Sequence, residues 1–159
     1  MSFSSKFAMV VEDDPCFRAI AVLMLQRMNF KSVVAEEDGE QAWAHLNFMR
    51  FDFILSDWNM APMDGMDLLR CVRANRQLSK IPFVLMSADL SLNSWRRAID
   101  AGATDFLVKP FSWEQLHETV GISFSTPCAD QANVVKFRSR KDNLMFERNR
   151  RPPDGSLRG

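Results

Sequence analysis

Five polar side chains in this sequence follow or end short hydrophobic segments: Glu12, Asp13, Asp57, Ser87 and Lys109. Carboxylates held a few ångströms apart raise one another's pKa, so a site that gathers them needs a cation between them. Oxygen donors without His or Cys favour a hard ion such as Mg²⁺, which binds one or two carboxylates and keeps several water ligands. The residue types therefore predict a divalent cation site.

The same residue types suit the formation of an aspartyl phosphate. A carboxylate can attack a phosphoryl group and hold it covalently. Such a transfer depends mostly on positioning and electrostatics, and it needs a divalent cation, a fixed lysine and a hydroxyl group near the phosphoryl oxygens. In this interpretation Asp57 is the nucleophile, an acid pair binds the cation, and Lys109 and Ser87 balance the charge on the phosphoryl group.

Short hydrophobic segments alternate with longer segments of helical periodicity, which predicts a parallel sheet with crossover helices. The segments are nearly continuous in their hydrophobicity, as in strands that helices cover on both faces. Strands are expected at 7–11, 32–35, 53–56, 83–87 and 106–108. Helices are expected at about 15–28, 39–46, 66–75, 91–101 and 112–124. In such a sheet, functional groups gather at the carboxyl ends of the strands.

Helix ends and one aromatic position can also be predicted. Asp14 is expected to cap the first helix, with Pro15 at its first position. Ser112 and Gln115 have the spacing of a capping box at the start of the last helix. Trp95, at helical spacing with its hydrophobic neighbours, is expected in the core.

The length and composition favour one globular domain with a tail. The chain has 159 residues, 47% of them hydrophobic, and a formal net charge of zero. Its three cysteines are odd in number and include no CxxC pair, which favours reduced cysteines in the cytoplasm over disulfides or a zinc site. The N-terminus lacks the hydrophobic segment of a signal peptide, and no apolar run approaches the roughly 20 residues of a membrane span. Export and membrane insertion are therefore not expected.

Residues 125–159 differ in composition from the rest. They carry eight basic and four acidic residues, show no sustained periodicity and end in RRPPDGSLRG. Such a segment is predicted to be disordered or only partly ordered.

Four segments, VVEDDP, LSDWNMAPMDG, VLMSAD and AGATDFLVKPF, occur in this order. Together they resemble the receiver domains of two-component response regulators, most closely the single-domain chemotaxis (CheY-like) type. The resemblance covers residues 6–124 and implies a flavodoxin-like, three-layer (βα)₅ sandwich whose parallel five-stranded sheet has the order 2-1-3-4-5.

The resemblance implies a metal site next to a phosphoacceptor. Asp57 would accept the phosphoryl group, with Mg²⁺ as the cofactor and Mn²⁺ as a substitute. Asp13 would bind the metal directly and Glu12 through water, while Asn59 would offer its backbone carbonyl oxygen.

The resemblance also implies a switch. The hydroxyl group of Ser87 would turn towards the phosphoryl group, and the ring of Phe106 would follow it inwards. Lys109 would contact the phosphoryl oxygens, and the Lys109–Pro110 peptide bond is expected to be cis.

Three features bear on how this chain would work. Glu12 replaces the commoner Asp of the acid pair, and Phe106 lacks the hydroxyl group of a Tyr. Asn59 and Asp89 occupy the two positions that tune dephosphorylation in the family, and both side chains are expected to orient a hydrolytic water.

The expected function is that of a stand-alone phosphoryl-accepting switch, not of an enzyme. A sensor histidine kinase or phosphotransfer protein would phosphorylate the chain. The surface formed by the helix at 91–101, the strand at 106–108 and the last helix would then bind a protein target such as a flagellar motor component. The protein is expected to be a monomer or a phosphorylation-dependent dimer.

The sequence is compatible with several alternatives. One is a relay receiver that passes phosphoryl groups to a histidine phosphotransfer protein. Another is a DNA-associated regulator acting through the basic tail, although no helix-turn-helix fits there and nucleic acid binding is not expected. A haloacid-dehalogenase-type phosphatase would need a second Asp where Asn59 stands, and three acids after the first strand would repel the phosphate of a flavin.

Overall fold

The computed structural model describes residues 3–89 and 91–125, so the predicted tail lies outside the described residues except for Ser125. Strands and helices alternate along this part of the chain. The strands are β1 (Phe7–Val11), β2 (Ser32–Glu36), β3 (Phe53–Asp57), β4 (Phe83–Ser87) and β5 (Asp105–Val108). The helices are α1 (Pro15–Arg27), α2 (Gly39–Leu46), α3 (Gly65–Ala74), α4 (Leu92–Asp100) and α5 (Trp113–Ser125). Among the described residues, no helix is long and apolar enough to cross a membrane.

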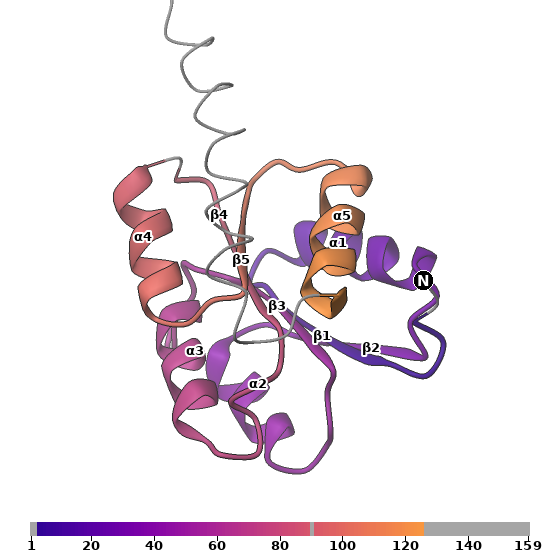
Figure 1. The fold of residues 1–159 in the computed structure, drawn as a ribbon, viewed down its shortest axis with the longest axis horizontal. Coiled ribbons are helices and arrows are strands. Elements are labelled where there is room, and N and C mark those ends of the chain that lie inside the picture. Colours follow the sequence, from indigo (N-terminus) through magenta and orange to yellow (C-terminus); the bar gives the residue numbers. More distant parts are fainter. Residues whose placement is uncertain (1–2, 90, 126–159) are drawn as a thin grey trace, which may run out of the picture. The chain divides into compact units, whose positions relative to one another are not determined.

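All neighbouring strands pair in parallel, in the order β2-β1-β3-β4-β5 (Figure 1). This confirms the flavodoxin-like (βα)₅ fold and its predicted strand order. β2 lies on one side of β1, whereas β3, β4 and β5 follow on its other side, so the direction of the crossovers reverses between β1 and β3. In sheets of this kind, ligands bind at the carboxyl edge where the direction reverses. Val11 pairs with Ser56, and Asp57 pairs with Met86, so the ends of β1, β3 and β4 lie at the same edge.

Helices cover both faces of the sheet, with α1 and α5 on one face and α2, α3 and α4 on the other (Figure 1). Leu25 of α1 and Leu116 of α5 belong to the same hydrophobic cluster as Leu55 of β3. Leu69 of α3 belongs to the opposite cluster, together with Ile54. Because successive side chains of a strand point to opposite faces, β3 is buried on both sides, which explains its continuous hydrophobicity.

The predicted helix caps are confirmed. The Asp14 side chain accepts a hydrogen bond of 2.7 Å from the backbone N–H of Phe17. The Ser112 N–H donates to Gln115 Oε1 at 2.8 Å, and the Gln115 N–H donates to Ser112 Oγ at 3.3 Å, as in a capping box. The expectation that Trp95 lies in the core is wrong, because Trp95 is only half-buried and Ala98 is the residue of α4 that is buried.

Candidate phosphoryl-acceptor site

Asp57 is the last residue of β3, where it pairs with Met86 of β4, and two backbone hydrogen bonds hold the residue that follows it. The N–H of Trp58 donates to Met86 O at 2.8 Å, and the N–H of Gly65 donates to Trp58 O at 3.0 Å. The residue exposes only 6% of its surface. The strand thus fixes the backbone of Asp57, while the side chain reaches the carboxyl edge of the sheet.

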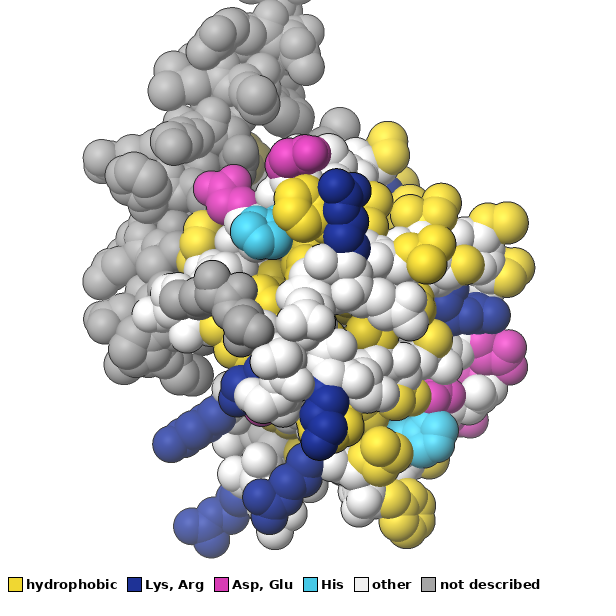
Figure 2. Space-filling view, turned by 90° about the vertical axis from the view of Figure 1, so that its right-hand side faces the viewer, with side chains coloured by type: hydrophobic (Ala, Val, Ile, Leu, Met, Phe, Trp, Pro, Cys, Tyr) yellow, Lys and Arg dark blue, Asp and Glu magenta, His cyan; other side chains and the backbone are white. Residues whose placement is uncertain are grey.

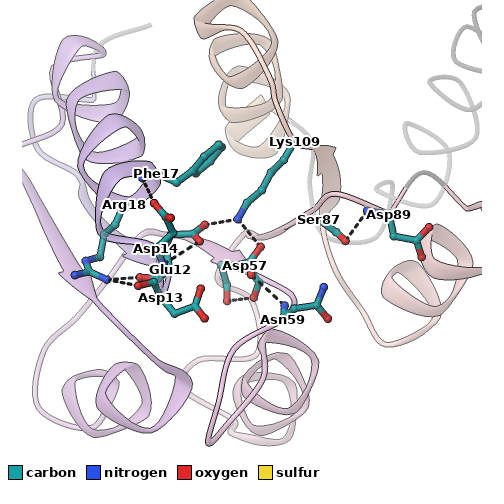
Figure 3. A network of polar contacts seen from close by, with 11 residues as sticks. Glu12, Asp13, Asp14, Phe17, Arg18, Asp57, Asn59, Ser87, Asp89 and Lys109 are labelled. Atoms are coloured by element: carbon teal, nitrogen blue, oxygen red, sulfur yellow. Dashed lines mark hydrogen bonds and ion pairs between the residues drawn. The ribbon is translucent and has the colours of Figure 1, made fainter.

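Lys109 connects Asp57 with Glu12 (Figure 3). Its Nζ lies 2.7 Å from Asp57 Oδ1 and 2.5 Å from Glu12 Oε2. The residue follows β5, its backbone N–H donates to Ser87 O at 2.8 Å, and the Lys109–Pro110 peptide bond is cis in the structure. One ammonium group therefore serves two carboxylates that come from different strands.

Three carboxylates gather at this edge. Ligand oxygens of Glu12, Asp13 and Asp57 all lie within 4.8 Å of one another. Glu12 and Asp57 are buried, whereas Asp13 is exposed. One ammonium group cannot neutralise three carboxylates, and an all-oxygen set of donors matches the preference of Mg²⁺. The donor set fits a hard divalent cation.

Burial dominates the titration of this cluster. Burial raises the pKa of both Asp57 and Glu12, and the hydrogen bonds from Lys109 offset this only in part. Burial would lower the pKa of Lys109, but the two carboxylates outweigh it and raise that pKa above its ordinary value. Ionisation of the two acids therefore opposes folding, whereas the charge of the lysine supports it.

Asn59 and Gly65 shape the loop after β3. The backbone N–H of Asn59 donates to Asp57 Oδ2 at 3.1 Å, and the Asn59 side chain is exposed. The role of the Asn59 carbonyl oxygen as a metal ligand stays a prediction. An ideal Cβ on Gly65 would lie 2.0 Å from Asp57 O, a contact with backbone that cannot move without displacing the acceptor.

Gly65→Ala is therefore expected to destabilise the fold by about 2–4 kcal/mol and to weaken any reaction of Asp57. Urea unfolding would measure the stability loss. Gly121→Ala is the matched control, because no atom of the described residues outside its chain neighbours and its own helix backbone lies within 4 Å of a Cβ there, and alanine has the better helix propensity. Equal stability of Gly65→Ala and the wild type would contradict the role given to this close approach.

Ser87 lies at the expected edge, but Asp89 does not point towards Asp57 (Figure 3). Ser87 is buried, and its Oγ accepts a hydrogen bond of 3.0 Å from the Asp89 N–H. The Asp89 carboxylate instead accepts hydrogen bonds from the hydroxyl groups of Ser94 and Ser91 and from the Ser91 N–H, and these bonds lower its pKa. The Asp89 carboxylate therefore binds residues at the start of α4 in this structure.

Phe106, the predicted switch residue, contacts the neighbour of Asp57. Its half-buried ring meets the Trp58 ring edge to face, with centroids 6.2 Å apart. The Arg97 guanidinium lies 5.4 Å from the centroid of the same indole. Trp58 thus connects α4 and β5 with the end of β3.

Two residues in the first turn of α1, Phe17 and Arg18, contact the site although the sequence did not predict them as site residues. Arg18 Nη1 donates to the backbone oxygens of Glu12 and Asp13, at 2.5 and 3.3 Å. Lys109 Nζ lies 4.5 Å from the centroid of the Phe17 ring. The position of Asp14 could have indicated these contacts, because a helix that Asp14 caps must start beside the two acids that precede it.

The model of the response regulator receiver domain family matches residues 8–121. The chain belongs to this family. Among the curated receiver proteins it resembles, chemotaxis protein CheY of Pseudomonas aeruginosa is 34% identical over 112 residues, which are 70% of this chain and 90% of that protein. Chemotaxis protein CheY-3 of Vibrio cholerae is 33% identical over 110 residues, covering 69% of this chain and 85% of that protein.

Solved receiver structures share the fold. The chemotaxis response regulator CheY4 of Vibrio cholerae matches with a TM-score of 0.70 and 30% identity, over 74% of this chain and 98% of that chain. The receiver domain of a Pseudomonas aeruginosa sensor histidine kinase, solved with a magnesium ion in its active site cleft, matches with a TM-score of 0.70 and 26% identity, over 76% of this chain and 98% of that chain. The present chain is thus a CheY-like receiver domain of a two-component response regulator, a signalling switch and not a conventional enzyme.

Proposed function

We propose that Asp57 accepts a phosphoryl group from a sensor histidine kinase or phosphotransfer protein, and that phosphorylation changes the affinity of the chain for a protein target in the cytoplasm. The observation that carries this proposal is the Asp57 carboxylate, held at the end of β3 at 2.7 Å from Lys109 and inside a cluster of three acids. A nucleophile, a fixed cation and a donor set for a second cation are the requirements of acyl phosphate formation.

The side chains of Asp13 and Asp57 would hold Mg²⁺, with Glu12 acting through water and Asn59 through its backbone carbonyl oxygen. Mn²⁺ is expected to substitute because it accepts similar oxygen donors. When bound, the metal supplies positive charge that stabilises the phosphoryl oxygens. The magnesium-containing relative supports this assignment.

In the transfer step an Asp57 oxygen forms a bond to phosphorus while the bond from phosphorus to the donor's imidazole nitrogen breaks. The bonding electrons leave with that nitrogen, which then takes up a proton. Lys109 stays within reach of the developing charge, and Ser87 supplies a hydroxyl group once it gives up its bond to the Asp89 N–H. These groups act by electrostatic stabilisation.

In the separate hydrolysis step water attacks phosphorus and gives up a proton, the bond from phosphorus to Asp57 breaks, and inorganic phosphate and the free carboxylate form. Asn59 lies next to Asp57 with an exposed amide, and it is the residue we assign to the orientation of this water. The Asp89 carboxylate is engaged by Ser91 and Ser94, so its contribution requires a rearrangement of the start of α4.

Asn59→Ala is accordingly expected to slow the decay of the phosphoryl group about threefold to tenfold, because an oriented water reacts faster than a free one. Asp89→Ala is the comparison and is expected to change the decay less. Decay after removal of the phosphodonor measures both variants. An unchanged rate in Asn59→Ala would exclude the assigned role.

The output would run through Ser87 and Phe106 to the surface formed by α4, β5 and α5. A population shift of this kind needs only a few kcal/mol of differential affinity. The CheY relatives favour a chemotaxis-like output, with a flagellar motor component as the expected target and a monomer or phosphorylation-dependent dimer as the expected state.

The phosphodonor is expected to approach over α1, beside the site. Ile20 and Leu23 of α1 expose 47% and 64% of their surfaces. Figure 2 views the side of the molecule on which α1 and α5 lie, and hydrophobic side chains are exposed on that side. Exposed apolar groups of this kind favour a protein partner.

The test is phosphorylation of the full chain with labelled acetyl phosphate, with and without Mg²⁺. We expect Mg²⁺-dependent incorporation that hydroxylamine removes and that maps to the peptide containing Asp57. Fluorescence of Trp58, next to the acceptor, should respond first to Mg²⁺ and then to the phosphodonor. Incorporation at another residue, or none at all, would refute the proposed function.

A further inference from the structure

The aromatic ring of Phe17 lies against the charged end of Lys109 (Figure 3). The distance from Lys109 Nζ to the ring centroid is 4.5 Å, well within the roughly 6 Å over which a ring face attracts an ammonium group. The lysine side chain is only 16% exposed, so little water screens this attraction. Phe17 is therefore the third partner of the ammonium group, besides Asp57 and Glu12.

The position of the ring is fixed by its own neighbours. The N–H of Phe17 donates to the Asp14 cap, which places the residue in the first turn of α1. The ring meets the Phe111 ring edge to face, with centroids 5.5 Å apart and planes at 80°. Phe111 is buried, and it lies two residues after Lys109 in the chain. The ring is thus held from α1 and from the segment that carries the lysine.

Lys109 needs such support because its charge is at the end of a flexible four-carbon stem with three rotatable donors. Two carboxylates compete for it, with Nζ at 2.5 Å from Glu12 and 2.7 Å from Asp57. An aromatic face attracts the cation but accepts no strong hydrogen bond, so it can hold the ammonium group in place without taking it from Asp57.

We propose that Phe17 is a positioning residue for phosphoryl transfer, which keeps the Lys109 ammonium group where it can follow the charge from the Asp57 carboxylate to the phosphoryl oxygens. This inference rests on the proposed function. It concerns the rate of transfer, because electrostatic stabilisation depends on groups that are in place before the reaction.

A packing role for Phe17 is separable from this electrostatic role. Removal of the ring would leave a gap next to Phe111 and lower stability for that reason alone. Fluorination of the ring nearly preserves its size but withdraws the negative charge from its face. A series of fluorinated rings therefore changes the attraction for Lys109 with little change in packing.

The experiment uses the full chain with phenylalanine, 4-fluoro-, 3,5-difluoro- or 3,4,5-trifluorophenylalanine at position 17. Phosphorylation by acetyl phosphate at saturating Mg²⁺ should slow stepwise along the series, by about fivefold at the trifluoro ring. Mg²⁺ affinity, followed by tryptophan fluorescence, should stay within about twofold, because the metal ligands assigned above do not include Phe17. The thermal midpoint should change little. Phe17→Leu should slow the reaction at least as much as the trifluoro ring.

Phe124 offers a matched control, since Lys6 Nζ lies 5.9 Å from its ring centroid. Its ring packs on Phe53, at the opposite end of β3 from Asp57, so the same fluorinated series there should leave the rate unchanged. A rate that is constant along the position 17 series, in a chain that is phosphorylated normally, would overturn the inference alone. A wild-type chain that takes up no phosphoryl group would overturn the proposed function and the inference with it.

Discussion

Asp57→Asn should abolish phosphoryl incorporation and, at pH 7, raise the free energy of unfolding by about 1 kcal/mol. The amide has nearly the shape of the carboxylate but is not a nucleophile for this reaction. The substitution also removes a buried carboxylate, and burial has raised the pKa of that group. Lys109 retains Glu12 as an ionic partner in the variant. The loss of phosphorylation and the gain in stability would thus both result from the replacement of one carboxylate oxygen of Asp57.

The stability difference should depend on pH with a defined sign. An acid whose pKa is raised in the fold contributes most to stability below its ordinary value of 3.8, and this contribution is lost as the pH rises through its folded value. Wild type and Asp57→Asn should therefore be most alike in acid and diverge towards neutral pH. Urea unfolding between pH 4 and 8 in the absence of divalent cations measures this difference.

Asp52→Asn is the matched control, because Asp52 lies just before β3 and pairs with Lys6 at 2.9 Å in a half-exposed setting. It should lose a little stability, by less than about 1 kcal/mol, and keep full phosphorylation. A phosphorylated Asp57→Asn chain, or one less stable than the wild type at pH 7, would contradict this account.

Lys109→Met should lower the free energy of unfolding by about 2–3 kcal/mol at pH 7 without divalent cations. The substitution keeps much of the side-chain volume but leaves Glu12 and Asp57, whose side chains are 1% and 8% exposed, without their shared cation. The loss should shrink as the pH falls and the acids protonate, and also when Mg²⁺ binds the native state. Phosphorylation should slow about a hundredfold, since a fixed positive charge is missing in the transition state.

Lys6→Met provides the comparison for this prediction. It breaks an ion pair of similar length, 2.9 Å, whose side chains are 41% and 31% exposed, and it should change stability by less than about 1 kcal/mol. Chemical unfolding with and without Mg²⁺ tests both variants. Equal losses in the two variants, or a loss at position 109 that Mg²⁺ does not reduce, would argue against a buried acid cluster that depends on its lysine.

Much of the fold was predictable because its determinants are local. Continuous hydrophobic segments such as 53–56 indicate strands covered on both faces, and the side chains of Asp14 and Ser112 cap helices within three residues of themselves. The strand order came from the family resemblance and not from periodicity, since pairing between strands is not encoded in any one segment. Trp95 was misplaced because helical spacing does not say which face of α4 meets the sheet.

By itself, the sequence determined which groups stand at the carboxyl edge of the sheet, because a parallel strand that ends on Asp57 or precedes Lys109 must present it there. Only the tertiary structure decided their partners. It places Lys109 between Glu12 and Asp57, sets the Phe17 ring against the ammonium group, and gives the Asp89 carboxylate to α4. The physical reason is that side-chain contacts across 97 residues depend on strand order, helix packing and burial, none of which a local pattern contains.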